Sequence, residues 1–197
     1  IESVHAQYDE VKSYVGIDEK VVKAFYEEIV PLGILAHHKY RGRPGLYLRP
    51  KIGDQNYDAE IIDKSSGNER IKRVEFTSTH RDADLALRME SLAKHGSVFM
   101  AGAVWREGTK ASGGQIHVVP GAEDSESCFD DLVAIIEERV AKKLAMPYAP
   151  STILAIVYDD YRHRSRTHVP QLQAYLRYTL SKQVLDKFCG VCILGVS

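Results

Sequence analysis

The sequence predicts an α/β fold in which a mixed β-sheet is flanked by helices. Short apolar runs with strand character alternate with segments of helical periodicity. Two of the early strand candidates are joined by a turn-rich connection that is typical of a hairpin. Residues 153–158 (ILAIVY) form a continuous apolar run that suits a buried central strand. Helices packed on a sheet that is partly paired through hairpins are the expected outcome.

Length and composition indicate one globular domain over residues 1–197. The chain has a net charge of −1, and its 44% hydrophobic and 27% charged residues are ordinary for a protein with a substantial core. No apolar run approaches the ~20 residues that span a bilayer. Because the first residues show no basic segment followed by an apolar stretch, we expect a cytoplasmic protein without a membrane partner.

Three cysteines are an odd number, which argues against a disulfide framework. Cys189 and Cys192 form a CxxC, but they lie in an apolar segment that is predicted to be a terminal strand. We therefore favour buried structural cysteines over metal or redox chemistry.

The first half of the chain is predicted to contain one helix followed by three short strands. Residues 18–30 carry apolar side chains near helical spacing, and Pro31 with Gly33 is expected to end this helix. The strand candidates are short runs bounded by turn residues, and they cover residues 46–48, 57–62 and 70–77. Pro50 makes the first strand short or places it at an edge. The turn residues at 63–68 predict a hairpin between the second and third strands.

The second half is predicted to alternate helices with strands. Thr79 can cap a helix that ends at His95, before Gly96. Further helices are expected over about 127–145 and 170–185. The expected strands share a high content of apolar residues, and they cover residues 98–104, 115–119, 153–158 and 191–196.

Acidic residues alternate along the two strands of the predicted hairpin. Asp58 and Glu60 share one face of their strand, and Glu75 and Thr77 share one face of the next. The hairpin can therefore gather two or three carboxylates around one point. Clustered carboxylates repel one another unless a cation lies between them, and hard oxygen ligands suit Mg²⁺ or Mn²⁺. The alternative is a set of solvated carboxylates on the exposed side of a hairpin.

This arrangement of elements and acids resembles the core of the PD-(D/E)XK, or restriction-endonuclease-like, nucleases. The resemblance covers roughly the first half of the chain and implies a restriction-endonuclease-like core. It implies that Asp58 is the first acid, that Glu75 is the second, and that Glu28 on the preceding helix is an auxiliary acid. Together with Glu60, these residues would be the ligands of Mg²⁺ or Mn²⁺.

The lysine of the family pattern is replaced by Thr77 in this sequence. In the family that lysine positions the attacking water and neutralises charge in the transition state. Some members supply it from a neighbouring element, and Lys142 and Lys143 on the predicted helix 127–145 are candidates, with Lys143 taken as catalytic. Lys72 is an odd number of positions from Glu75 and is expected to face away from it.

Two basic segments and one helical arginine are candidates for contacts with nucleic-acid phosphates. Arg41 and Arg43 lie in the first basic segment, and Arg164 and Arg166 lie in the second. Arg88 would suit a phosphate if its side chain lay on the sheet side of the predicted helix. Solvated loops and a salt-bridged helix face are the alternatives.

Two hypotheses follow for the function. The first is a metal-dependent nuclease that acts on nucleic-acid phosphodiesters, with DNA favoured over RNA. The second is a catalytically inactive domain of the same fold that binds nucleic acid or a protein partner. An enzyme of another class has little support, because the sequence contains no Gly-x-Ser-x-Gly elbow, no P-loop and no GxGxxG after a strand. A homo-oligomer is left open.

Overall fold

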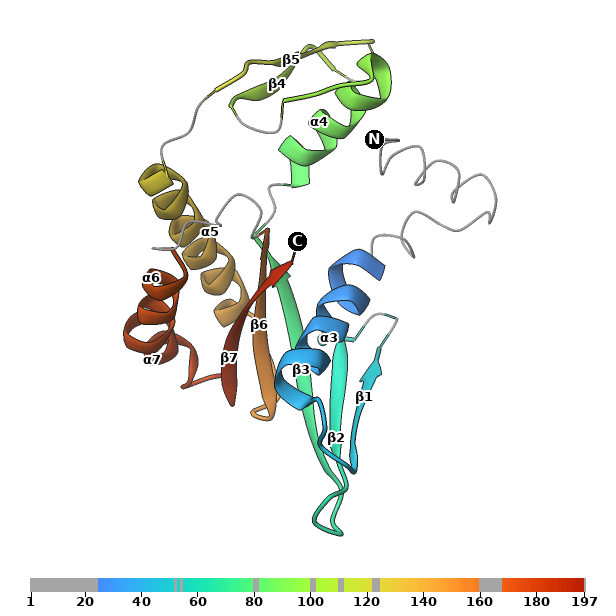
Figure 1. The fold of residues 1–197 in the computed structure, drawn as a ribbon, viewed down its shortest axis with the longest axis vertical. Coiled ribbons are helices and arrows are strands. Elements are labelled where there is room, and N and C mark those ends of the chain that lie inside the picture. Colours follow the sequence, from blue (N-terminus) through green and yellow to red (C-terminus); the bar gives the residue numbers. More distant parts are fainter. Residues whose placement is uncertain are drawn as a thin grey trace, which may run out of the picture. The chain divides into compact units, whose positions relative to one another are not determined.

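Figure 1 shows the computed structural model of the chain, which describes residues 25–51, 53, 55–79, 82–99, 102–109, 112–121, 125–159 and 168–196. The chain divides into two compact units. Unit 1 comprises Ile1–Asp18 and His80–Cys128, and unit 2 comprises Glu19–Thr79 and Phe129–Ser197. The single domain expected over residues 1–197 stays a prediction.

A five-stranded mixed sheet forms the centre of unit 2, with the strand order β1-β2-β3-β6-β7 (Figure 1). The strands are β1 Leu46–Pro50, β2 Ala59–Asp63, β3 Arg70–Ser78, β6 Thr152–Asp159 and β7 Gly190–Val196. The first three pair antiparallel in sequence, whereas β6 is parallel to both β3 and β7. The predicted mixed α/β architecture, the hairpin and the edge position of β1 are confirmed. The apolar run at 153–158 forms an interior strand, as predicted.

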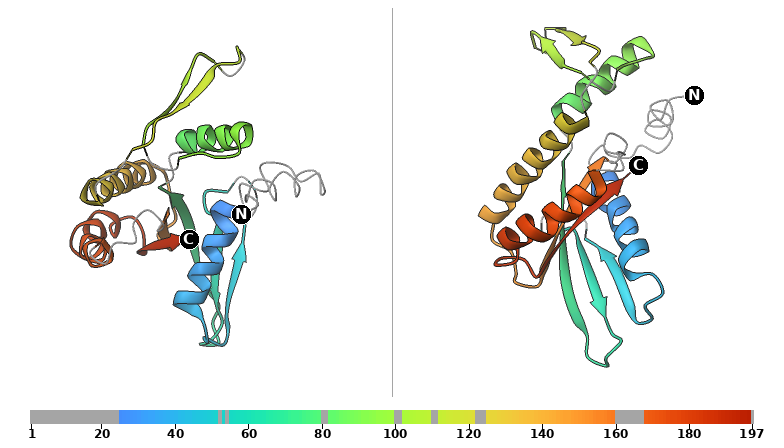
Figure 2. Two further views of the ribbon diagram at one scale, coloured as in Figure 1. Left: turned by 45° about the horizontal axis from the view of Figure 1, so that its top comes forward. Right: turned by 60° about the vertical axis from the view of Figure 1, so that its left-hand side comes forward.

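Helices cover both faces of this sheet, and Figure 2 shows them from two further directions. On one face lies a helical run made of η1 Phe25–Ile29, α3 Val30–Leu35 and η2 Ala36–Tyr40. The other face carries α5 Ser125–Ala145, α6 His168–Tyr175, η3 Leu176–Leu180 and α7 Ser181–Val184. Among the residues that the structure describes, no helix is both long and apolar enough to cross a membrane.

Strand alternation divides the apolar side chains of the sheet between two cores. Val74 and Ile153 pack with Leu32 and Leu35 of the helical run. Leu154 lies on the opposite face and packs with the apolar side of α5, α6 and α7. The interior strand β6 therefore contributes to both cores, which explains why it is apolar at every position from 153 to 157.

The helical run continues to Tyr40, so the predicted end of a helix at Pro31 and Gly33 is wrong. Pro31 lies inside this run, just after η1, so its missing amide costs one intrahelical hydrogen bond, and the run nevertheless continues. Gly33 only lowers helix propensity. Burial of Leu32 and Leu35 compensates for that cost. As a result, the first part of the basic segment that contains Arg41 and Arg43, residues 37–40, is helical and not a loop.

Unit 1 contains α4 Asp82–His95 and a two-stranded antiparallel ribbon of β4 Val104–Glu107 and β5 Gln115–Val118. Gly96 ends α4 as predicted, with φ 72° and its amide donating to the Leu92 carbonyl at 2.8 Å. The strand predicted over 98–104 is wrong, because β4 begins only at Val104. Gly102 has φ 92° and leaves the extended conformation just before that point.

The cysteine pair at the start of β7 differs in exposure. Cys192 is half-buried and packs against the core next to the helical run, whereas Cys189 is exposed. Burial of both, as the apolar segment predicts, is therefore wrong for Cys189, which precedes the strand. Its amide donates to the Thr152 carbonyl at 2.8 Å and joins β7 to β6.

The core between β6 and α5 can be tested with a pair of leucine truncations. Leu154 is 0% exposed, so Leu154→Ala leaves a cavity, and we expect it to reduce the free energy of unfolding by about 2–5 kcal/mol. Leu185 is 52% exposed, and we expect Leu185→Ala to change it by no more than about 0.5 kcal/mol. Urea unfolding measures both, and equal losses would contradict the assigned core.

Candidate active site

Asp58 immediately precedes β2, and backbone hydrogen bonds hold it against β3. Its amide donates to the Val74 carbonyl at 2.8 Å, and its carbonyl accepts from the Lys51 amide at 2.8 Å. Its carboxylate Oδ2 accepts from the Phe76 amide at 2.7 Å. The main chain on both sides therefore fixes the Asp58 carboxylate beside Glu75, which lies between Val74 and Phe76.

Glu75 is a buried carboxylate in the interior of the sheet, with 6% of its surface exposed. The Lys143 ammonium, from the last turn of α5, forms an ion pair with its Oε1. The Tyr148 hydroxyl donates to the same oxygen at 3.2 Å. Of the two candidate lysines, it is Lys143 that reaches the acid, whereas Lys142 pairs with Glu138 on the helix surface.

Thr77 and Lys72 occupy the positions that alternation predicts. Thr77 is buried on β3 two residues after Glu75, so it shares the Glu75 face. Lys72 is exposed and pairs in register with Ile61, a residue of the core on the other face. The cation that meets Glu75 is therefore Lys143 from α5, and not a residue of β3.

The Asp58 carboxyl has a perturbed acidity. Its burial, reinforced by the negative charge of Glu75, raises its pKa to about 7. The hydrogen bond from the Phe76 amide lowers the pKa, Glu28 raises it, and Lys143 lowers it. A further cation beside Asp58 would favour the ionised form, so this group is poised to exchange its proton for a bound cation.

Glu28 belongs to the same electrostatic environment, although it lies on η1. Burial raises its pKa, and the charges of Glu27 and Glu75 raise it further. Glu28 in turn contributes to the raised pKa of Asp58. The three acids that the family resemblance singles out therefore act on one another across η1, β2 and β3.

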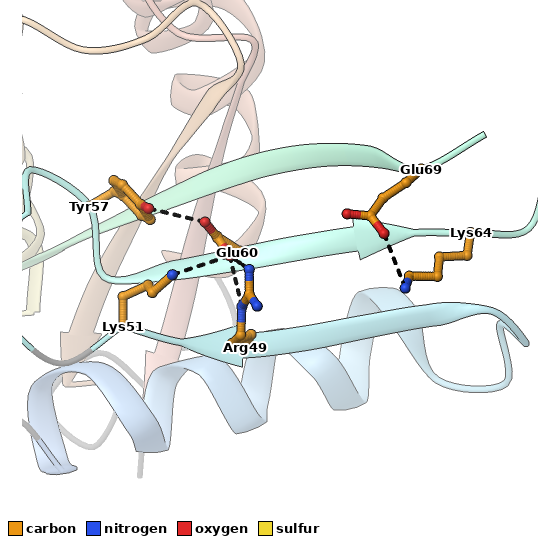
Figure 3. A network of polar contacts seen from close by, with 6 residues as sticks. All are labelled: Arg49, Lys51, Tyr57, Glu60, Lys64 and Glu69. Atoms are coloured by element: carbon orange, nitrogen blue, oxygen red, sulfur yellow. Dashed lines mark hydrogen bonds and ion pairs between the residues drawn. The ribbon is translucent and has the colours of Figure 1, made fainter.

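Glu60 is directed elsewhere, as Figure 3 shows. Its carboxylate accepts hydrogen bonds from Arg49 Nε at 2.9 Å and from the Tyr57 hydroxyl at 3.0 Å, and Lys51 Nζ lies 3.7 Å away. Burial acts to raise its pKa, but these partners hold the pKa below its ordinary value. Glu60 is thus already compensated by cations, and the metal role expected for it finds no support in this geometry.

Two carboxylates are the donor set that the structure offers to a metal. Within the described ranges, no group of three His, Cys, Asp or Glu side chains is arranged to hold a metal ion. Asp58 Oδ2 and Glu75 Oε1 are engaged, which leaves Asp58 Oδ1 and Glu75 Oε2 without a hydrogen bond to described residues. Mg²⁺ is commonly bound through one or two carboxylates and keeps several waters, so these oxygens are donors of the kind that Mg²⁺ or Mn²⁺ takes.

Tyr148 is the residue near the site that the sequence analysis missed. It follows the end of α5, outside any periodic segment, and no spacing rule links it to Glu75. Its loop is tied to the segment before Asp58, because Asn56 Nδ2 donates to the Pro147 carbonyl at 2.7 Å. The only sequence signal was its closeness to Lys143.

Of the four arginines in the basic segments that are predicted to contact phosphate, two lie among the described residues. Arg41 and Arg43 are exposed just after η2, and the Arg43 guanidinium lies 5.8 Å from the centre of the Tyr40 ring. Arg164 and Arg166 lie outside the described residues. The expected contacts of these four arginines with phosphate stay predictions.

Arg88 has a structural position within unit 1. It is 7% exposed and donates to the backbone carbonyls of Phe99 and Gly102. Nearby on α4, Glu90 pairs with Arg106 at 2.5 Å, which agrees with the alternative of a salt-bridged helix. A phosphate contact by Arg88 finds no support in this arrangement.

Comparison of the chain with protein-family models, with curated protein sequences and with solved structures finds no match. The function is therefore inferred from the residues of unit 2 around Glu75.

The pKa of Asp58 predicts a pH-dependent loss of stability in the metal-free protein. Its folded pKa of about 7 lies above the ordinary value of 3.8, so its stabilising contribution is complete below pH 3.8 and is lost as the pH rises through 7. At ~1.4 kcal/mol for each pH unit between these values, the loss is at most about 4 kcal/mol.

Urea unfolding in EDTA from pH 4 to 8 measures this loss. We expect Asp58→Asn to flatten the decline, because the amide does not titrate. Asp186→Asn, which replaces an exposed carboxylate, is the matched control and should leave the decline in place. Parallel curves for the wild type and Asp58→Asn would show that Asp58 is ionised throughout.

Proposed function

We propose that unit 2 carries a metal-dependent nuclease site of the restriction-endonuclease-like class, which cleaves nucleic-acid phosphodiesters, with DNA as the favoured substrate. The observation that carries the proposal is the ion pair between Lys143 and Glu75 beside Asp58. It brings together two acids and a lysine, the residue types of the family pattern, even though β3 has Thr77 at the usual lysine position.

The topology of unit 2 supports this proposal. The helical run is followed by the antiparallel strands β1, β2 and β3 and, after the segment that holds α4, β4 and β5 in unit 1, by α5 and by β6 parallel to β3. Within unit 2 this gives the order helix, three strands, helix and strand, with α5 and β6 in place of the helix and strand that the family resemblance takes from the first half of the chain. We assign Asp58, immediately before β2, and Glu75, within β3, to the two acids of the family pattern.

Each residue has a proposed role in the reaction. Asp58 and Glu75 hold Mg²⁺ or Mn²⁺, with Glu28 nearby to tune their charge. When bound, the metal supplies charge that activates water and stabilises the phosphate. The Lys143 ammonium stabilises negative charge at the scissile phosphate. Its ion pair with Glu75 positions this ammonium, and the Tyr148 hydroxyl holds the same Glu75 oxygen.

A second candidate is a binding domain of the same fold without catalysis. One observation favours it: Lys143 and Tyr148 already satisfy Glu75, which is therefore compensated without a metal. In this case the acids and Lys143 stabilise the fold, and nucleic acid or a protein partner binds elsewhere on the surface.

A cleavage assay separates the two candidates. Single- and double-stranded DNA and RNA are incubated with the full chain in Mg²⁺, Mn²⁺ or EDTA. We expect metal-dependent cleavage that Asp58→Asn, Glu75→Gln and Lys143→Gln each reduce by about 10²-fold or more, since each removes a charge that acts on the transition state. Lys142→Gln, which removes an exposed cation one residue away, should retain activity. Cleavage that survives all three site variants would exclude this site.

A lysine exchange tests whether Lys143 replaces the family lysine. Thr77 shares the Glu75 face, so a lysine introduced there should approach the same carboxylate. We expect the double variant Thr77→Lys with Lys143→Gln to cleave at least about tenfold faster than Lys143→Gln alone. Because Thr77 is buried, circular dichroism must first show that the double variant folds. A folded double variant no faster than Lys143→Gln would contradict the exchange.

A further inference from the structure

The face of β1, β2 and β3 that carries Glu75 is open at its outer end. Alternation places Tyr47 and Arg49 of β1 and Ile71 of β3 on this face, opposite the core that contacts the helical run. Tyr47 is 57% exposed and Ile71 is 42% exposed, and the Arg49 side chain is 55% exposed. The open surface is therefore continuous along the strands with the carboxylate site.

A row of charged residues crosses this open face. Arg49, Glu60 and Arg73 are direct cross-strand partners on β1, β2 and β3. Lys51 reaches the same Glu60 carboxylate at 3.7 Å (Figure 3), and the Arg73 guanidinium lies 4.7 Å from the centre of the Tyr57 ring. We call Arg49, Lys51 and Arg73, with Glu60 between them, the cationic row. Arg49 and Lys51 contact the Glu60 carboxylate, and Arg73 adds a third cation, so the row keeps a net positive charge.

We propose that the cationic row binds the phosphodiester backbone of a nucleic acid and leads it to the carboxylate site, an inference that rests on the proposed nuclease function. Arg73 lies two residues before Glu75 on the same strand and face, a separation of about 6.6 Å at ~3.3 Å per residue. Successive phosphates of one strand are ~3.4 Å apart along a duplex axis. Arg73, at this end of the row, is therefore placed to hold a phosphate one or two nucleotides away from the phosphate that lies at Glu75.

Glu60 acquires a role in this surface as the residue that positions its cations. Its hydrogen bonds to Arg49 and Tyr57, and its contact with Lys51, hold these long side chains in one arrangement. A guanidinium held in this way loses less side-chain entropy when it binds a phosphate. The acid that the sequence analysis expects at the metal is thus part of the substrate surface.

The dependence of binding on salt measures the row directly. Fluorescein-labelled DNA duplex, the equal-length single strand and an RNA of the same sequence are titrated with the full chain in EDTA, so that no cleavage intervenes. In a plot of log K against log salt, the slope decreases in magnitude by about 0.9 for each duplex phosphate contact that is removed, and by about 0.7 for each contact with a single strand. We expect Lys51→Gln and Arg49→Gln each to lower the slope by about this amount, and the double variant by about twice as much.

Two further variants make the test two-sided. Lys142→Gln removes an exposed cation outside the row and should leave the slope unchanged. Glu60→Gln removes the negative charge of the row but keeps an oxygen that can accept the hydrogen bonds from Arg49 and Tyr57, so we expect tighter binding. Lys51→Gln keeps the Glu60 bonds to Arg49 and Tyr57, so it remains informative if Arg49→Gln fails to fold.

The outcomes distinguish this surface from the nuclease proposal. Unchanged slopes in Lys51→Gln and Arg49→Gln, or a wild-type chain that binds none of the three probes, would overturn the cationic row. Weaker binding by Glu60→Gln would also overturn it. If the slopes change as expected but no metal ion supports cleavage, the surface stands and the catalytic proposal fails. If Asp58 and Glu75 are needed for cleavage while the slopes do not change, the reverse holds.

Discussion

A buried carboxylate in an interior strand is the constraint around which unit 2 is arranged. Glu75 lies on β3 between the two cores, where an unpaired charge would be strongly destabilising. The ammonium of Lys143 and the hydroxyl of Tyr148 meet it from α5 and the loop that follows. This compensation joins the end of α5 to the centre of the sheet. The bond from Asn56 to Pro147 then ties the segment before Asp58 to the same loop.

The charges on this face of the sheet are sorted into two groups. Asp58 and Glu75 have Lys143 as their nearby cation, so the acids are in excess there, and protonation of Asp58, whose pKa is raised to about 7, relieves their repulsion. Around Glu60 the cations are in excess instead. A site with surplus carboxylates beside a surface with surplus cations suits a substrate that brings its own negative charge together with a metal ion. Under the proposed function, binding of a metal ion would release the Asp58 proton and so couple metal binding to pH.

Local periodicity explains how much of this could be predicted from the sequence. The alternation of acids on β2 and β3 follows from the two-residue period of a strand, so the shared face of Asp58 and Glu75 was predictable from neighbouring residues alone. The apolar run of β6 similarly predicts burial on both faces. Local signals failed at Pro31, where packing of the flanking apolar residues carries the helix onward.

The mixed α/β architecture, the hairpin and the pair of acids can be predicted from the sequence alone, because each depends on residues close together in the chain. Which of Lys142 and Lys143 reaches Glu75 follows from the folded structure, since it depends on how the end of α5 is rotated against β3. The folded structure also decides that Glu60 faces cations from β1. Alternation assigns a side chain to a face of the sheet, but the partner that it meets there comes from distant segments whose packing no local pattern encodes.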